Sequence, residues 1–336
     1  MALRRLGWHV SGRDRDPERA AQALKLGALD RMGDDAAASV TFVATPVRAI
    51  AAEALNALAA GSGLVTDVGG VKAPIVDAVA DPRFLGGHPM AGSEQEGLEG
   101  AAADLFEGAT WVLTPTERSD AGAYAQVQQI VTALGADVVA LPPERHDALV
   151  AVVSHVPHLT AATLMRLAAG RGEEHGALLR LAAGGFRDMT RIAAGSPLIW
   201  PDICSENQAA ITDVLDELTA ALGDIRDLVV RGDRAALLDL LDEAQAARVN
   251  LPVHMRRVED LREVRVPVPD RPGVLADVTT AATELGVNIV DLEIAHSSEG
   301  TRGVLILLVD TAAVELLRRG LADRGYRSSV RAVESP

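Results

Sequence analysis

The chain contains 336 residues, of which 48% are hydrophobic, and it carries a formal net charge of -15 at pH 7. This acidic balance disfavours nucleic acid and anionic membranes as partners, because both bind basic surfaces. A single cysteine, Cys204, excludes an internal disulfide and fits a reducing compartment. No apolar run approaches the length of a membrane span, and residues 1–5 lack the apolar core of a signal peptide, so we expect a cytoplasmic protein.

Residues 1–141 alternate apolar strand patterns with helix patterns, which is typical of a parallel sheet wound by helices. Strands are expected at 8–12, 40–44, 64–68, 84–87, 111–113 and 137–140, and helices at 20–26, 48–58 and 71–79. The pattern resembles a Rossmann-like dinucleotide-binding domain that is N-terminally truncated. Residues 3–7 already fit the end of its first helix, so the first strand and the glycine-rich turn that holds the pyrophosphate are missing.

Several strand ends in this region carry candidate cofactor ligands. Ligands of open α/β sheets bind at the carboxyl ends of strands, so we expect these turns to line one crevice. An acidic residue after the second strand favours NAD, whereas Arg13 and Arg15 beside it leave NADP open, and a solvated charged turn is the structural alternative. The candidates are Asp14, Thr45, Pro46, Asp67 and Val68.

A histidine set between glycines and a proline follows the strand at 84–87, in the run Gly86-Gly87-His88-Pro89. Glycine lets the backbone pass close to a ligand, and proline fixes the direction in which the chain leaves. The imidazole of His88 can exchange a proton near neutral pH. We therefore expect His88 to face the same crevice, with a satisfied loop histidine as the alternative.

From about residue 142 the pattern changes to helices. A helix at 149–167 carries His155 and His158, which are three positions apart and lie on neighbouring parts of one face. Pro157 is expected to bend this helix. Two histidines at this spacing suit a metal, but no third ligand is evident nearby, so we expect no metal site, and one of the two could be a core histidine.

Two further helical features follow. Gly184 and Gly185 precede Arg187 and Arg191, an arrangement that suits a loop delivering guanidinium groups to a carboxylate, although ordinary surface arginines would look the same. An apolar seam then runs along one helix and predicts either a bundle core or a dimer interface. The seam consists of Ile211, Leu215, Leu218, Leu222, Ile225 and Val229.

The last part of the chain has the order βαββαβ, which predicts a four-stranded antiparallel sheet with both helices on one face. Strands are expected at 262–267, 287–295, 304–309 and 327–333, and helices at 272–285 and 312–321. The turns at 270–275 and 285–289 resemble those of the ACT domain, a small module that senses amino acids.

Taken together, the three parts resemble the prephenate dehydrogenase family of tyrosine biosynthesis, in the form with a C-terminal ACT domain. The resemblance implies a dinucleotide-binding domain at 1–141, an all-α substrate and dimerisation domain at 142–256 and an ACT regulatory domain at 260–336. It runs from about residue 3 to the end and is carried by six ordered motifs. These are Ala44-Thr45-Pro46, Thr66-Asp67-Val68-Gly69-Gly70-Val71-Lys72, Gly87-His88-Pro89-Met90-Ala91-Gly92-Ser93-Glu94, Val153-Ser154-His155-Val156-Pro157-His158, Gly185-Phe186-Arg187-Asp188-Met189-Thr190-Arg191 and Ser196-Pro197-Leu198-Ile199-Trp200.

The resemblance implies oxidative decarboxylation of prephenate to 4-hydroxyphenylpyruvate, with NAD as the cofactor and NADP as the alternative, in a homodimer. His88 matches the family's catalytic histidine, which takes up the proton of the ring hydroxyl, and Arg191 matches its carboxylate-binding arginine. The positions matching substrate-binding residues are His158 at the pyruvyl side chain, Glu94 near the entrance, Trp200 at the gating loop, and Gly70.

Two departures from the family pattern affect these expectations. The family usually has serine at the position of Gly70, so one hydrogen bond to the histidine or substrate is lost and we expect reduced activity. The missing first strand and glycine turn predict weak cofactor binding if the chain begins at Met1. Arogenate dehydrogenase, a non-catalytic amino-acid-binding regulator and an interaction protein built on the helical seam therefore stay as alternatives.

The ACT resemblance also implies regulation. We expect tyrosine or a related aromatic amino acid to bind near Asp270, Gly273 and Asn288 and to lower activity, and an ACT fold kept only for dimer packing is the alternative.

Overall fold

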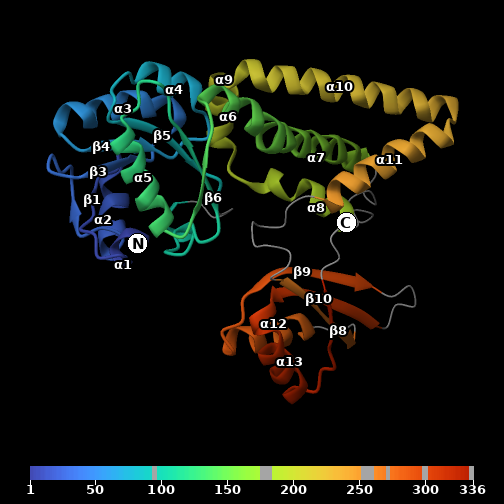
Figure 1. Ribbon diagram of the computed structural model, residues 1–336. Helices are drawn as coiled ribbons and strands as arrows, with labels where there is room; N and C mark the ends of the chain where they lie inside the picture. Colours follow the sequence, from blue (N-terminus) through green and yellow to red (C-terminus); the bar gives the residue numbers. More distant parts are fainter. Residues whose placement is uncertain (93–96, 175–183, 251–260, 270–272, 297–301, 333–336) are drawn as a thin grey trace. The chain divides into compact units, whose positions relative to one another are not determined.

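The computed structural model describes residues 1–92, 97–174, 184–250, 261–269, 273–296 and 302–332. The chain divides into two compact units, Met1–Asp227 and Leu228–Pro336. Figure 1 labels the elements of both. The division falls inside one long helix, so it does not test the three domains expected from the sequence, and their boundaries stay a prediction.

The first unit is built on a five-stranded sheet with the order β3-β4-β5-β6-β7. Its strands are β3 (Val40–Val43), β4 (Leu64–Asp67), β5 (Phe84–Pro89), β6 (Thr110–Thr114) and β7 (Asp137–Ala140). All neighbours are parallel except β5 and β6, which are antiparallel, so the expectation of a wholly parallel sheet is wrong. Parallel pairing needs a crossover, usually a helix, and the described part of the β5–β6 connection contains only the short 3-10 helix Gly97–Gly100.

Helices cover both faces of this sheet (Figure 1). On one face, α3 (Val47–Ala60) and α4 (Ala73–Ala78) bury Ile50 and Val76 against Phe84. On the other face, α5 (Ala121–Ala133) buries Val127 against Leu85 and Trp111. Phe84 and Leu85 are neighbours on β5 and point to opposite faces, as the pleat of a strand requires. The middle of the sheet is thereby fixed on both sides, which positions the end of β5.

A separate two-stranded parallel sheet precedes the large one. It pairs β1 (Ser11–Gly12) with β2 (Arg31–Met32), with α1 (Ala2–Arg5) before it and α2 (Pro17–Lys25) between the strands. The sequence predicted a strand at 8–12, which is longer than the observed β1. It predicted no strand at β2, because a two-residue strand gives almost no periodic signal. The side chain of Asp16 caps α2 by accepting the Glu18 N–H, which sets where that helix begins.

The helical part of the first unit starts with α6 (Pro143–Val150), a π-helical turn (Ala151–His155) and α7 (Val156–Glu174). The single helix expected at 149–167 is thus longer, and its irregularity lies in the turn before Pro157. Proline has no N–H to continue the regular ladder, and π turns often accompany functional side chains. By length and composition alone, the stretch Pro143–Arg171 would suffice to cross a membrane, with 28% of its apolar window buried.

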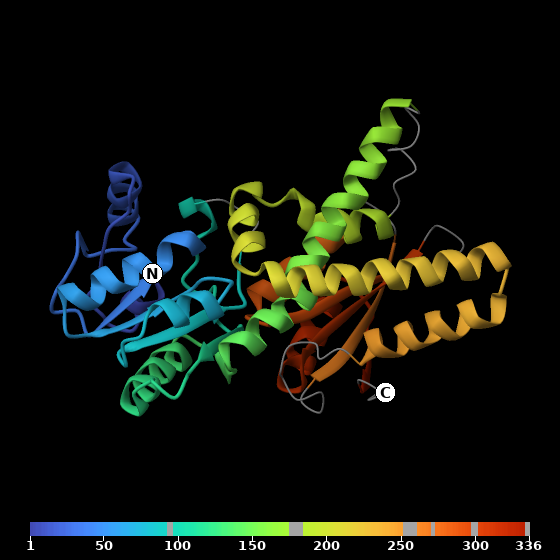
Figure 2. The same cartoon turned by 90° about the horizontal axis from the view of Figure 1, so that it is seen from above.

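The chain continues through α8 (Gly184–Thr190), two 3-10 helices (Arg191–Ala194 and Pro197–Ile199), α9 (Trp200–Glu206) and α10 (Gln208–Arg231). Figure 2 shows α7 and α10 extending from the sheet region toward the same side, as does Figure 1. The first residue of the predicted seam, Ile211, is buried in a cluster with Val71 and Ala151. Leu222 and Val229 farther along are more than half exposed. The seam is therefore core at its start and open surface at its end.

The second unit contains α11 (Arg234–Val249) and a four-stranded antiparallel sheet with the order β11-β8-β10-β9. Its elements are β8 (Leu261–Pro269), α12 (Val274–Glu284), β9 (Ile289–His296), β10 (Arg302–Asp310), a 3-10 helix (Thr311–Ala313), α13 (Val314–Asp323) and β11 (Ser329–Ala332). The order βαββαβ confirms the predicted arrangement. Val266 and Leu307 on the sheet pack against Val278 and Leu317 of the two helices.

Candidate active site

His88 lies near the carboxyl end of β5, half-buried, with its ring edge against the ring of His146. The Nδ1 atom of His88 is 2.8 Å from Nε2 of His146. Burial, with smaller contributions from the charges of His146, Lys72 and His155, lowers the pKa of His88 to about 3. His88 is therefore neutral at pH 7, which is the form that accepts a proton.

Behind His88, the residues His146 and Asp147 on α6 are buried. The Nδ1 atom of His146 is 2.8 Å from Oδ1 of Asp147. The Asp147 carboxylate also accepts the backbone N–H groups of Lys72 and Ala73, each at 2.8 Å, and its carbonyl accepts Nδ2 of Asn207 at 2.9 Å. Asp147 thus fixes the beginning of α4 to α6 and leaves His146 one defined orientation.

A buried ion pair supports the same corner of the sheet. Lys72 and Asp67 are both fully buried; Lys72 Nζ donates to the Asp67 carboxylate and, at 2.9 Å, to the carbonyl of Gly87. The carboxylate also accepts the N–H groups of Gly69 at 2.8 Å and Gly87 at 3.1 Å. Burial lowers the pKa of Lys72. The pair fastens the end of β4 to the residue before His88.

Asp67 was also predicted to bind the cofactor, and that role stays a prediction. Its side chain has no exposed surface, and its carboxylate is bound by Lys72 and two backbone N–H groups. The carboxylate therefore stabilises the structure around the end of β4.

Gly70 leaves open space in front of His88. A Cβ placed on Gly70 would lie 3.7 Å from Nε2 and 3.8 Å from Cε1 of His88, at ordinary contact distance, and would meet nothing else within 4 Å. At Gly69, by contrast, a Cβ would come within 2.5 Å of a methyl group of Ile50. The Nε2 side of the imidazole therefore faces the turn after β4. At position 69 this turn packs closely against Ile50 of α3, so a larger residue there would force Ile50 to move.

His158 and Trp200 are in direct contact. Their rings stack with centroids 3.6 Å apart and planes 14° from parallel, and His155 meets the same indole edge-on. His155 is the buried histidine of the two; its Nδ1 is 3.2 Å from Nδ2 of Asn207, and burial lowers its pKa to about 4. Burial also lowers the pKa of His158. Among the described residues, a continuous chain of contacts thus runs from His88 through the buried cluster to Trp200 and His158.

Arg191 is exposed and begins the 3-10 helix that packs against α7. His158 is on that same helix, α7. The structure therefore joins Gly70, His88, His158 and Trp200 in one set of contacts, whereas Arg191 is connected to the set through the packing of its helix.

The remaining predicted cofactor positions lie on exposed turns. Asp14, Thr45 and Pro46 are exposed, and Val68 is half-buried. Oδ1 of Asp14 accepts a hydrogen bond from the N–H of Asp16, and Oδ2 lies 3.8 Å from Nη1 of Arg19, so acceptor capacity is left for a ribose hydroxyl. Arg13 is engaged by Asp34 and Glu53. This donor and acceptor set fits a dinucleotide with a free ribose diol.

Two predicted residues, Glu94 and Asp270, lie outside the described part of the chain. In the second unit, Gly273 has a φ of +89° and forms the N-cap of α12, while Asn288 is exposed just before β9. The left-handed backbone at Gly273 is one that other residues adopt at a cost.

Sequence reasoning missed His146, Asp147 and Asn207. An adjacent His-Asp pair on a helix is an ordinary surface pattern, and nothing in its spacing indicates that it lies behind a histidine 58 positions away. The only available signal was that His146 and Asp147 directly precede an apolar helix that carries two more histidines.

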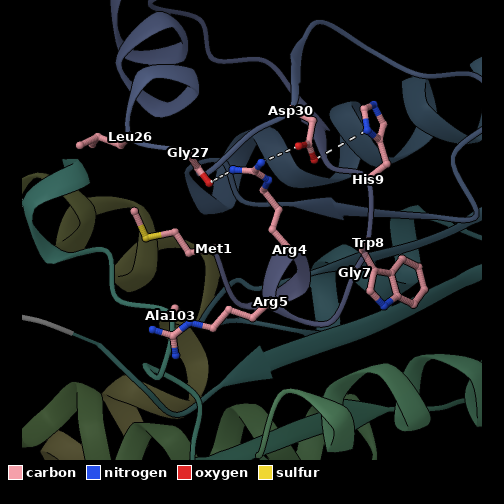
Figure 3. A pocket seen from close by; sticks show the side chains of 10 residues that line it. All are labelled: Met1, Arg4, Arg5, Gly7, Trp8, His9, Leu26, Gly27, Asp30 and Ala103. Carbon is pink, nitrogen blue, oxygen red and sulfur yellow. Dashed lines mark hydrogen bonds and ion pairs between the residues drawn. The ribbon is translucent and has the colours of Figure 1, made fainter.

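A shallow cavity of about 660 Å³ lies elsewhere in the first unit, between α1 and the turn after α2 (Figure 3). In it, Arg4 bridges the carbonyl of Gly27 and the carboxylate of Asp30, and His9 faces the same carboxylate. None of the candidate site residues lines this cavity, so it is distinct from the His88 cluster.

A sheet of dinucleotide-binding type, with a neutral histidine at the carboxyl end of one strand, is an arrangement found in nicotinamide-dependent dehydrogenases. Residues 1–140 match the family described as prephenate dehydrogenase, nucleotide-binding domain, residues 142–243 match prephenate dehydrogenase, dimerization domain, and residues 262–322 match the ACT domain. The chain belongs to the prephenate dehydrogenase family.

Individual relatives agree with this. A prephenate dehydrogenase from Bacillus subtilis is 35% identical over 89% of this chain and 84% of its own length. The crystal structure of prephenate dehydrogenase from A. aeolicus, in complex with hydroxyphenyl propionate and NAD+, is similar with a TM-score of 0.70 and 30% identity, covering 75% of this chain and 92% of that one. An arogenate dehydrogenase from Synechocystis has a TM-score of 0.63 and 30% identity, covering 74% and 92%.

Proposed function

We propose that this protein is an NAD-dependent prephenate dehydrogenase, which oxidatively decarboxylates prephenate to 4-hydroxyphenylpyruvate and carbon dioxide. The observation that carries the proposal is the neutral imidazole of His88, whose Nε2 faces the open space beside Gly70, in a chain of this family. A base at this place can take the proton of the substrate's ring hydroxyl.

His88 acts in both halves of the reaction. When bound, NAD supplies the acceptor for the hydride that leaves the hydroxyl-bearing ring carbon. Nε2 of His88 takes the hydroxyl proton as that C–H bond breaks, which leaves a ring ketone. When the bond to the ring carboxylate breaks and carbon dioxide departs, its electron pair makes the ring aromatic and His88 returns the proton to the phenolate oxygen. A positioned base of this kind contributes roughly 10²–10⁴ in rate.

Other residues bind and orient the two ligands. We propose Asp14 for the ribose hydroxyls and the turns at Thr45, Pro46 and Val68 for the remainder of the cofactor, all of them at the carboxyl ends of strands. The enclosed carboxylate of Asp67 connects the end of β4 to Lys72 and Gly87, next to these turns.

On the substrate side, Arg191 is proposed to bind a carboxylate and His158 to face the pyruvyl group. Trp200 stacks on His158 and so limits the orientations of its ring. Glu94 is proposed at the entrance on the strength of its motif alone. His88 and His158 are held on β5 and α7, two rigid elements, which favours a fixed distance between the two ends of the substrate.

We further propose a homodimer that an aromatic amino acid inhibits. The exposed apolar residues Leu222 and Val229 of α10, in the part of the chain that matches a dimerization domain, would pack against a second copy. Gly273 and Asn288 would form part of the effector site of the ACT domain. Calorimetric titration of the whole protein with tyrosine tests this: heat of binding together with a fall in activity is expected, and no binding of any aromatic amino acid contradicts it. A cytoplasmic location is part of the same proposal.

Enzyme assays with purified protein test the reaction. We expect reduced cofactor and carbon dioxide to form in equal amounts from prephenate with NAD, and at a much lower rate with arogenate or with NADP. Faster turnover of arogenate would make the protein an arogenate dehydrogenase. Tyrosine binding without turnover of either substrate would make it a non-catalytic regulator.

A further inference from the structure

The hydrogen bonds behind His88 assign a proton to each ring nitrogen in the cluster. The carboxylate of Asp147 accepts hydrogen bonds from the backbone N–H groups of Lys72 and Ala73, each at 2.8 Å. Its Oδ1 atom also lies 2.8 Å from Nδ1 of His146. A carboxylate oxygen accepts hydrogen bonds and has none to donate. Nδ1 of His146 therefore carries the hydrogen of this contact, and in an imidazole with a single hydrogen the Nε2 atom is left as an acceptor.

The same logic continues to His88. Its Nδ1 lies 2.8 Å from the acceptor Nε2 of His146, so Nδ1 of His88 carries a hydrogen and donates it. A neutral imidazole holds only one such hydrogen, which leaves Nε2 bare. This is the atom that faces the space beside Gly70.

We propose that His146 and Asp147 are positioning residues that hold His88 in the tautomer with a bare Nε2. The inference rests on the proposed function for its catalytic consequence, whereas the tautomer is argued from the hydrogen-bond geometry of rings that each hold one hydrogen. An imidazole in water favours the opposite tautomer, so without these partners a large fraction of His88 would present an N–H to the substrate hydroxyl and could not accept its proton.

Burial and the charges near the ring favour an uncharged His88. The groups that act on it are His146 on α6, Lys72 before α4 and His155 in the π-helical turn, while Asp147 binds the far nitrogen of His146. Asn207 donates Nδ2 to Nδ1 of His155, so the hydrogen of that neutral ring is on Nε2. Lys72 is bound to Asp67 and not to either ring. Among the described residues, Asp147 is therefore the carboxylate at which the chain of hydrogen bonds through His146 to His88 begins.

Nitrogen NMR of protein labelled with ¹⁵N-histidine measures the tautomer without substrate, with the signals of His88 identified by their loss in His88→Gln. We expect the wild-type protein to show hydrogen on Nδ1 and a bare Nε2. In His146→Phe the acceptor is gone, so the hydrogen of His88 should move largely to Nε2. In His146→Gln the side-chain carbonyl restores an acceptor and the wild-type tautomer should persist.

Kinetics of the same variants distinguish positioning from a merely structural role. His146→Phe should lower kcat by about 100-fold or more with KM changed less than about threefold, because a misplaced hydrogen removes the base and not the binding contacts. His146→Gln should recover most of kcat, and His9→Gln, at an exposed histidine, should match the wild type.

Three results would overturn the proposal: hydrogen on Nε2 of His88 in the wild-type protein, wild-type kcat in His146→Phe, or a His146→Gln variant as impaired as His146→Phe. The first needs no variant to fold. A wild-type protein with a bare Nε2 but no turnover of prephenate or arogenate supports the tautomer and overturns the proposed reaction, so the two failures are distinguishable.

Discussion

The Nδ1 atom of His88 and the Nε2 atom of His146 are 2.8 Å apart, although 58 positions separate the two residues in the chain. One ring belongs to the sheet and the other to the first helix of the helical layer. The contact therefore forms only when both layers are folded and packed together. The orientation of the proposed base therefore depends on the packing of the helical layer against the sheet.

Gly70→Ser is expected to raise kcat/KM by about 2–10-fold. The added Cβ would lie 3.7 Å from Nε2 of His88 without a clash, so the hydroxyl can reach the imidazole or the substrate hydroxyl and supply one hydrogen bond of about 0.5–1.5 kcal/mol. Steady-state rates with prephenate measure the effect. Gly70→Ala, which adds the Cβ alone, should show no gain, and an equal gain in both variants would disprove the hydrogen-bond explanation.

Lys72→Met is expected to destabilise the protein by about 3–5 kcal/mol, because it leaves the buried carboxylate of Asp67 without its cation. Urea unfolding measures the free energy. The double variant with Asp67→Asn should lose less than the sum of the two single variants, since the pair is in direct contact.

Arg48→Met is the control for the loss of an exposed arginine. Arg48 contacts Asp202 and Glu206 at the surface, where an ion pair contributes at most about 1 kcal/mol. A loss for Lys72→Met no larger than that of Arg48→Met would show that the buried pair does not hold the end of β4.

The free energy of unfolding should fall as the pH drops below 6.5. The folded-state pKa of His88 is about 3 and that of His155 about 4, both below the unfolded value of 6.5. Between those values the unfolded chain binds more protons, so each histidine lowers the stability by up to about 1.4 kcal/mol per pH unit as the pH falls. Urea unfolding between pH 7 and pH 5 should show a shallower slope in His155→Gln, and an unchanged slope would contradict the prediction.

Arg191→Gln is expected to raise KM for prephenate at least about tenfold, since a charge-assisted bond to a carboxylate is worth about 1.5–3 kcal/mol. Initial rates over a range of prephenate concentrations measure this. Arg187→Gln, an exposed arginine on the preceding helix α8, is the matched control and should leave KM unchanged. Equal effects of the two changes would mean that general positive charge, and not Arg191, attracts the substrate.

Much of the fold could be predicted because strands and helices here have clear periodicity. The βαββαβ order of the second unit and the positions of β3, β4 and β7 follow from it. The direction of β6 could not be predicted, since periodicity is the same for parallel and antiparallel strands. The π-helical turn at Ala151–His155 was also missed, because Pro157 indicates that a ladder is interrupted but not how the preceding turn adapts.

Motifs identified His88, Gly70, His158 and Trp200 as candidates, but they could not show which buried residues contact and orient these side chains. Asp67 is part of a motif that suggests a ligand contact, and only its burial reveals a carboxylate that binds Lys72 and the backbone. The pairing of His146 with His88 depends on a tertiary contact for which no local pattern exists.

The most direct test of the central claim is the rate at which reduced cofactor forms from prephenate and NAD in the wild-type protein and in His88→Ala. The wild type should turn over and the variant should lose about 10²–10⁴ in kcat while still binding NAD. A His88→Ala protein that retains wild-type kcat would contradict the assignment of His88 as the base.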